Sequence, residues 1–143
     1  MAVASPEAPV LTEELIQACG ERAAAYDRDN RFFSEDFEEL RRAGYLLLTV
    51  PKELGGRGMN LPQVCQEQRR LAYRAPATAL ATNMHPYWTG LASDLLRMGD
   101  DPGKWVLDEA AAGQVFAGGD GVAGQGFRGL VARRLRGRCG GGG

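Results

Sequence analysis

The stretch LRRAGYLLLTVPKELGGRG, residues 40–58, decides the fold. It opens on the end of a helical pattern, and Gly44 predicts that end because glycine adopts the left-handed helix-terminating conformation at little cost. The apolar run 45–51 is too short for a helix and stops at Pro51, so we expect a buried extended segment. The loop 53–58 lacks the lysine and hydroxyl residue of a phosphate-binding loop, so we expect a tight turn there.

Apolar residues recur at helical spacing on both sides of this stretch. Thr12 is a candidate N-cap for a first helix that ends near Asp27, and Ser34 is one for a second helix that ends before Gly44. Three further helices are expected: 62–73, 76–99 with a break at Pro86, and 101–113. A strand is expected to begin in residues 114–118. The pattern predicts an all-α, five-helix domain with β-structure starting after it.

Composition places the chain among globular proteins. It has 143 residues, of which 44% are apolar and 24% charged, and this is enough for one domain with a core. No apolar run approaches the roughly 18 to 20 residues that span a bilayer. Residues 1–9 lack the features of a signal peptide, so we expect a cytoplasmic protein with no membrane contact. The three cysteines are widely spaced, so we predict neither a metal site nor a disulfide.

The last part of the chain differs from the rest. Residues 121–143 contain five arginines, no acidic residue and nine of the 20 glycines. We therefore divide the chain into a flexible arm (1–10), a helical domain (11–119) and a Gly/Arg-rich tail (120–143) that is disordered or out of frame. The whole chain has only two lysines among 17 basic residues, which suggests GC-rich coding and a frameshift near 119–127. Arginines without interleaved aromatics predict no specific nucleic-acid partner.

Three segments, taken in order, resemble the acyl-CoA dehydrogenase family. Residues 40–58 are similar to its second helix and the loop that follows. Residues 70–85 are similar to its long helix beside the flavin and substrate cavity. Residues 105–119 are similar to its last N-terminal helix and the first strand of its middle domain. The resemblance spans about residues 12–119 and ends at Gly119.

The resemblance implies an α-helical N-terminal domain followed by a β-barrel, which would be incomplete here, and a four-helix bundle. It implies FAD as cofactor, an acyl-CoA substrate and a homo-oligomer in the full-length form. The parent activity would be FAD-dependent oxidation of the CH–CH group of an acyl-CoA thioester in fatty acid metabolism. The family's catalytic carboxylate lies beyond this region, so we expect the chain alone to be inactive. Two alternatives stay open: a non-catalytic helical module, and a fragment of a flavin-dependent monooxygenase of the same fold.

The break at Pro86 draws attention to its neighbours, because proline removes one helical hydrogen bond and broken helices often face cavities. A kinked helix whose aromatic residues are ordinary core is the alternative. The resemblance predicts no catalytic residue in this chain and no metal ligand. The predicted cofactor-binding residues are His85, Phe116 and Gly118. The predicted substrate-binding residues are Asn83, Tyr87 and Trp88.

Overall fold

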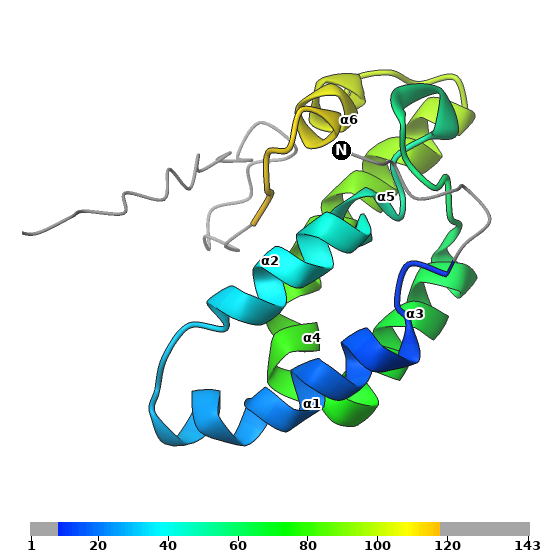
Figure 1. The fold of residues 1–143 in the computed structure, drawn as a ribbon. Coiled ribbons are helices and arrows are strands. Elements are labelled where there is room, and N and C mark those ends of the chain that lie inside the picture. The colour runs from blue at the N-terminus through cyan, green and yellow to red at the C-terminus, as the bar shows by residue number, and fades with distance from the viewer. Residues whose placement is uncertain (1–8, 118–143) are drawn as a thin grey trace, which may run out of the picture.

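The computed structural model describes residues 9–117, and the described part of the chain consists of helices and turns (Figure 1). Its α-helices are α1 (Glu13–Arg28), α2 (Ser34–Ala43), α3 (Leu61–Arg74), α4 (Pro76–Thr82), α5 (Met84–Arg97) and α6 (Lys104–Ala111). Two 3₁₀ turns, η1 (Tyr45–Leu47) and η2 (Lys52–Leu54), lie between α2 and α3. The all-α prediction is confirmed. There are six helices where we expected five because the pattern from Pro76 onward forms two separate helices.

Side chains and glycines set several of the helix ends. The Thr12 hydroxyl accepts a hydrogen bond from the Leu15 amide at 3.2 Å, so the predicted cap of α1 is confirmed. Gly44 ends α2 in the left-handed conformation with φ 87°, also as predicted. Asn60 and Gln63 form a reciprocal capping box at the start of α3. The prediction for Ser34 is wrong, because this residue is already inside α2 and no side chain caps that helix.

The prediction of an extended segment over residues 45–51 is also wrong. The Leu47 amide donates to the Gly44 carbonyl at 3.0 Å, which curls the start of this run into the turn η1. The run is nevertheless buried, since Tyr45, Leu48 and Val50 are all fully enclosed. The physical reason is that an extended segment needs a strand partner for its backbone, and the described residues contain none. The turn η1 and the amides of residues 57–59, which donate to the carbonyls of Leu47, Leu48 and Val50, satisfy the backbone instead.

The helix break lies three residues earlier than predicted. α4 ends at Thr82, and Asn83 joins it to α5. Pro86 lies in the first turn of α5, where a backbone N–H has no helical acceptor, so proline is tolerated there without a kink. The break therefore falls before the proline rather than at it.

The predicted strand 114–118 is not formed within the described residues. The Gln114 amide bonds back to the Glu109 carbonyl at 2.9 Å, and the Phe116 amide bonds to the ring of His85. Residues 114–117 are irregular and are held by these contacts. Residue 118 and the tail 120–143 lie outside the described residues.

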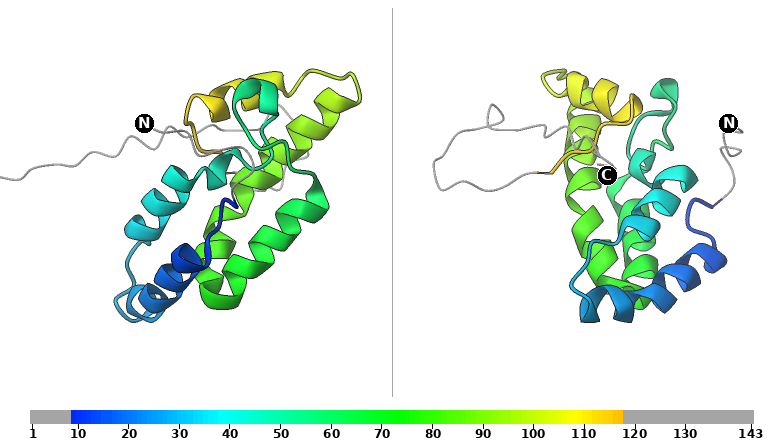
Figure 2. Two further views of the ribbon diagram at one scale, coloured as in Figure 1. Left: turned by 45° about the vertical axis from the view of Figure 1, so that its right-hand side comes forward. Right: turned by 60° about the vertical axis from the view of Figure 1, so that its left-hand side comes forward.

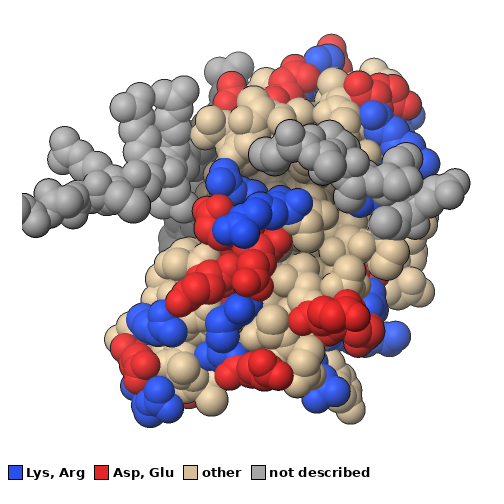
Figure 3. All heavy atoms as spheres, viewed as in Figure 1, with Lys and Arg blue, Asp and Glu red and all other residues tan. Residues whose placement is uncertain are grey.

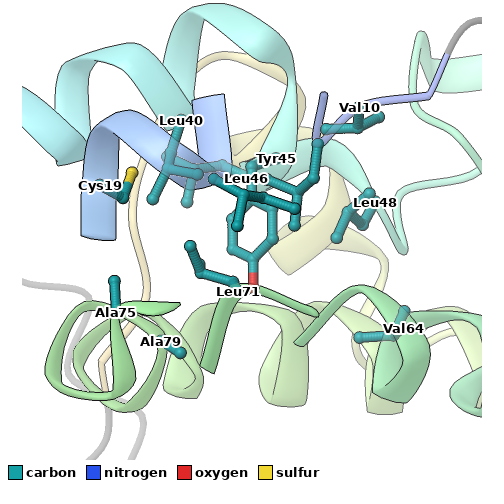
Figure 4. Close-up of a cluster of buried hydrophobic side chains, with 12 residues drawn as sticks. Val10, Cys19, Leu40, Tyr45, Leu46, Leu48, Val64, Leu71, Ala75 and Ala79 are labelled. Atoms are coloured by element: carbon teal, nitrogen blue, oxygen red, sulfur yellow. The ribbon is translucent and has the colours of Figure 1, made fainter. Parts of the chain in front are cut away.

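The main core lies where α1 and α2 cover α3 and α4, and Figure 2 shows this arrangement from two further sides. In Figure 4 the ring of Tyr45 stands at the centre of this core with its hydroxyl directed toward the green helices. Leu71 lies beside that ring, and Leu40 and Cys19 close the core from above. A second, smaller cluster joins α5 and α6, and its buried members are Val50, Ala92, Val106, Leu107, Ala110 and Phe116.

A buried ionic network fastens α1 to α2 and α4. The carboxylate of Asp36 is fully buried and accepts from the Arg22 Nε at 2.6 Å, the Tyr26 hydroxyl at 3.2 Å and the Thr78 hydroxyl at 3.0 Å. Arg22 also contacts Glu39 through its terminal nitrogens. Both oxygens of the Asp36 carboxylate thus accept hydrogen bonds, which is the condition for a buried charge to be tolerated.

The described surface mixes charges of both signs. On the face seen in Figure 3, basic and acidic side chains alternate over α1 and α2. No helix among residues 9–117 is long and apolar enough to cross a membrane.

Candidate functional site

A hollow of about 190 Å³ lies between the start of α3, the loop before it and α5. Its walls are largely apolar, because six of the nine residues that line it have an apolar side chain or none. The lining residues are Thr49, Met59, Leu61, Val64, Pro86, Tyr87, Gly90, Leu91 and Asp94. The hollow is the candidate site for an apolar ligand.

Backbone hydrogen bonds in the loop 47–59 build the first wall of the hollow. The Gly58 amide donates to the Val50 carbonyl at 2.8 Å, and the Met59 amide donates to the Leu48 carbonyl at 2.8 Å. These bonds fold the glycine-rich loop back on the buried run. They place Met59 beside Thr49 at the edge of the hollow. The predicted tight turn is confirmed, with Gly55 at φ 85° and Gly58 at φ 62°.

Thr49, which lines the hollow, forms a hydrogen bond with Thr89 of α5. The Thr89 hydroxyl donates to the carbonyl of His85 at 2.9 Å, so the contact of 2.6 Å between the two threonine hydroxyls is donated by Thr49. Both side chains are buried. Their polar atoms are used on each other, and the Thr49 methyl group faces Gly90. This explains how Thr49, a polar residue, can line an apolar space.

An ion pair between Arg97 and Asp94 orients the side chains at the outer edge of the hollow. Arg97 bonds Asp94, a lining residue, at 2.7 Å and also donates to the Gly58 carbonyl at 3.2 Å. One arginine therefore joins the end of α5 to the glycine-rich loop. The pair is about half exposed, so its contribution to stability is small, but it orients the rim.

His85 lies behind the hollow, in the core. Its Nε2 lies 2.7 Å from the Leu46 carbonyl, and its Nδ1 lies 3.0 Å from the Phe116 amide. A carbonyl only accepts and an amide only donates, so the ring is neutral with its proton on Nε2. Burial lowers the pKa of His85 from its ordinary value of 6.5, and the Leu46 carbonyl opposes this in part.

The structure describes five of the six predicted site residues and separates them into an exposed or half-buried group and a buried pair. Asn83 is exposed at the helix junction. Tyr87 is 56% exposed, lines the hollow and meets the ring of Trp88 edge-on at 5.1 Å, whereas Trp88 is half-buried against the second cluster. His85 and Phe116 are buried and bonded to each other. Gly118 lies outside the described residues.

The resemblance implies a flavin, so we ask whether the predicted cofactor-binding residues have hydrogen-bonding groups free to contact it. Both ring nitrogens of His85 and the Phe116 amide are occupied by hydrogen bonds within the chain. The two residues therefore do not fit hydrogen bonding to a flavin in this arrangement, and the contact predicted for them stays a prediction. The residues that could meet a second group are the exposed ones, Asn83 and Tyr87. Within residues 9–117, no cluster of histidine, cysteine or acidic residues could hold a metal ion.

The sequence reasoning missed several residues that line the hollow. Thr49 was part of the expected extended run, Val64 and Gly90 were assigned only to helices, and Leu61 was assigned to no element. One signal was available: Gly90 is a glycine within a helical apolar stripe, which indicates a close approach or a space beside the helix.

The comparison with known families decides where the chain belongs. Residues 10–104 match the model of the acyl-CoA dehydrogenase N-terminal domain. The chain belongs to the acyl-CoA dehydrogenase family. Over 94 residues it is 33% identical to YdbM of Bacillus subtilis (strain 168), which is provisionally named an acyl-CoA dehydrogenase. The match covers 66% of this chain and 25% of YdbM, so the chain spans about a quarter of the length of that acyl-CoA dehydrogenase relative. No solved structure matches the chain.

Within the acyl-CoA dehydrogenase family, the match includes α1 to α5 and therefore every residue that lines the hollow. It ends at the start of α6. Acyl-CoA dehydrogenases generally use FAD and act on acyl-CoA. The hollow thus belongs to the part of the chain that is shared with the family, and not to the divergent end.

Proposed function

We propose that this chain supplies the helical wall of an acyl-thioester site, in a protein whose activity is FAD-dependent oxidation of the CH–CH group of an acyl-CoA. The observation that carries the proposal is the apolar hollow beside α5, which has Tyr87 at its rim and lies inside the matched region. An acyl chain is apolar and flexible, and burial in such a space removes it from water.

The size of the hollow supports the role of a wall rather than that of a whole site. Sites for small molecules usually enclose about 300–1,000 Å³, and this hollow has about 190 Å³. The apolar side chains at its edge are also open, with Leu61 69% and Tyr87 56% exposed. Such exposure marks a surface that contacts something else. We infer that another part of the protein, or a second copy, completes the enclosure.

The exposed residues have separate roles in this proposal. Tyr87 and the neighbouring Trp88 form an aromatic edge along the acyl chain. Asn83 offers an amide that can donate to a thioester carbonyl. In this proposal FAD is held mainly by parts of the protein other than residues 9–117. The flavin contacts of His85 and Phe116 stay predictions, and neither residue takes part in the reaction. No catalytic residue is assigned in this chain, so we expect it to be inactive by itself. We also propose a homo-oligomeric, cytoplasmic protein.

Ligand titration tests the proposal. The uniformly ¹⁵N-labelled full chain is titrated with saturated acyl-CoAs of short, medium and long chain, and with CoA that carries no acyl group. We expect acyl-CoA to shift the amide resonances of Val64, Gly90 and Leu91, and CoA to leave them in place. Equal shifts with CoA, or shifts confined to other helices, would overturn the proposal.

A pair of variants sharpens that test. Gly90→Leu places a side chain in the hollow and should abolish the acyl-dependent shifts. Ala81→Leu adds the same side chain at an exposed position of α4 that does not line the hollow, and should leave them unchanged. Both variants keep the helix-forming character of their positions, so their folds can be compared by circular dichroism.

A flavin titration distinguishes the alternatives. With FAD added, we expect little quenching of flavin fluorescence and no reduction by acyl-CoA, because in this proposal residues 9–117 form only one wall of the site. Stoichiometric FAD binding with reduction by acyl-CoA would show a complete enzyme and refute the proposal. Flavin binding without acyl-dependent shifts favours the monooxygenase alternative. Neither flavin nor acyl-CoA binding favours the non-catalytic module.

A further inference from the structure

The ring of His85 connects three segments that are far apart in the sequence. The residue itself belongs to α5, its Nε2 proton bonds the carbonyl of Leu46 in η1, and its Nδ1 accepts from the amide of Phe116. The rings of His85 and Phe116 are also stacked, with centroids 6.0 Å apart. These contacts hold Phe116, and with it residues 114–117, against the helical domain.

The two hydrogen bonds of the ring require one protonation state. In the neutral ring with its proton on Nε2, each nitrogen faces a group of complementary kind. A second proton would turn Nδ1 into a donor that faces another donor, the Phe116 amide, while the bond from Nε2 to Leu46 would persist. The repulsion between two hydrogen-bond donors would therefore arise only at Nδ1, where the ring meets the Phe116 amide. It is relieved by moving Phe116, which brings Nδ1 into contact with water.

Among residues 9–117, the surroundings of the ring contain no charge that offsets this conflict. η1 carries Tyr45, which stays protonated because burial raises its pKa to about 12, and α4 carries no charged residue. Within the described residues, no carboxylate, lysine or arginine affects the pKa of His85. The charged residues of α5 and α6, all of them exposed, are Asp94, Arg97, Lys104, Asp108 and Glu109.

We propose that neutral His85 is the positioning residue that fixes residues 114–117 on the helical domain, and that its protonation releases this segment while α1–α5 stay folded. The proposal rests on the hydrogen bonds of the ring and does not depend on acyl-CoA or FAD binding. Since burial holds the His85 pKa below 6.5, the segment is fixed at neutral pH. It is released as the pH falls through this lowered pKa.

Amide hydrogen exchange of the full chain tests the proposal. The protection factor of the Phe116 amide is measured between neutral and mildly acidic pH, together with that of Leu71 in the main core. The ¹⁵N shifts of the His85 ring report its protonation in the same samples. We expect Phe116 protection to fall about tenfold or more as the ring is protonated, which is the size of one buried hydrogen bond, with Leu71 unchanged. Constant Phe116 protection through the ring titration would overturn the proposal, and so would loss of protection at both amides together.

Two variants separate positioning from a general packing role. In His85→Asn the side-chain oxygen lies near the place of Nδ1 and does not titrate, so Phe116 should stay protected at all these pH values. In His85→Gln the amide nitrogen lies near the place of Nε2, so Leu46 keeps a donor and Phe116 should be unprotected throughout. Equal behaviour of the two variants would contradict the proposal. If either variant fails to fold, the wild-type titration still decides.

Discussion

The two sides of this helical domain treat their buried groups differently. On the side of α1, α2 and α4, the carboxylate of Asp36 is bonded by three side chains. On the side of α3 and α5, a hollow remains, and Leu61 and Tyr87 at its edge are more than half exposed. Closed packing with paired polar groups stabilises a fold, whereas open apolar surface leaves free energy of burial to be gained from a ligand or a partner. The first side therefore encloses a paired charge, and the second leaves an apolar space that we propose contacts a ligand or a partner.

The largest expected effect concerns the loop that forms the wall of the hollow. A Cβ atom on Gly56 would lie 2.0 Å from the Val50 carbonyl oxygen, a backbone atom that cannot move aside. We expect Gly56→Ala to lower the free energy of unfolding by about 4 kcal/mol, measured by urea denaturation. Gly55→Ala is the control: it has φ 85° but no atom within 4 Å, so it should lose only about 1–2 kcal/mol. Equal losses would show that the loop yields and that the open side is softer than we describe.

The next effect concerns the closed side. Arg22→Met removes the cation from the fully buried Asp36, which keeps only two hydroxyl donors. An uncompensated buried charge costs about 3–5 kcal/mol, but Arg22 is 27% exposed, so we expect a loss of about 2–3 kcal/mol. Arg28→Met breaks an exposed pair with Asp29 and should change stability by less than about 0.5 kcal/mol. A similar, small effect of both variants would mean that the network does not hold the closed side together.

Sequence reasoning found most of the closed side, because that side follows local rules. The Thr12 cap and the left-handed Gly44 depend on a few neighbouring residues, and both are confirmed. The burial of the run 45–51 follows from its composition alone. Its conformation does not, since the choice between strand and turn depends on whether a partner strand exists elsewhere. The burial of this run was therefore predicted correctly, but its backbone conformation was predicted wrongly.

The open side was harder to predict, because it is made by contacts between distant residues. Thr49 and Thr89 are 40 positions apart, and the partners of His85 are 39 and 31 positions away. No pattern in the sequence shows that these residues meet. Proline drew attention to the right part of the chain, since Pro86 and Tyr87 do line the hollow. It also misplaced the helix break, because the tolerance of proline in a first turn depends on where the helix begins.

A smaller effect tests the boundary between the two sides, where Tyr45 stands. Burial raises its pKa from 10 to about 12, and its hydroxyl lies near Thr82 and Gln68 without a hydrogen bond to any described residue. A raised pKa means that this stability is complete below pH 10 and is lost as the pH rises through about 12. Tyr45→Phe should be nearly neutral at pH 7. It should gain about 1–2 kcal/mol over the wild type by about pH 11.5, because one pKa unit is worth about 1.4 kcal/mol.

The comparison for Tyr45 uses the difference between the two proteins at each pH, measured by urea denaturation. Tyr26 and Cys19 also have raised pKa values, about 12 and about 11, but they are present in both proteins and cancel in the difference. A difference that stays constant from pH 7 to about pH 11.5 would mean that the Tyr45 hydroxyl reaches water, and that the two sides are joined by an open passage rather than a sealed core.

The smallest effect makes the same substitution once on each side. Gly90 lies inside α5 at the hollow, and an added Cβ would meet the Thr49 methyl group at 3.4 Å, an ordinary contact. Gly90→Ala should therefore gain the helix preference of alanine, about 0.5–1 kcal/mol. Gly20 lies inside α1 on the closed side, where the same atom would meet the Cβ of Arg74 at 3.1 Å. There the two helices must separate slightly, so Gly20→Ala should gain nothing or lose up to about 1 kcal/mol. A rise in the unfolding temperature for Gly90→Ala and a fall for Gly20→Ala would confirm that there is space for one more carbon at Gly90 but not at Gly20. A rise for both variants would mean that the closed side is no better packed than the open one.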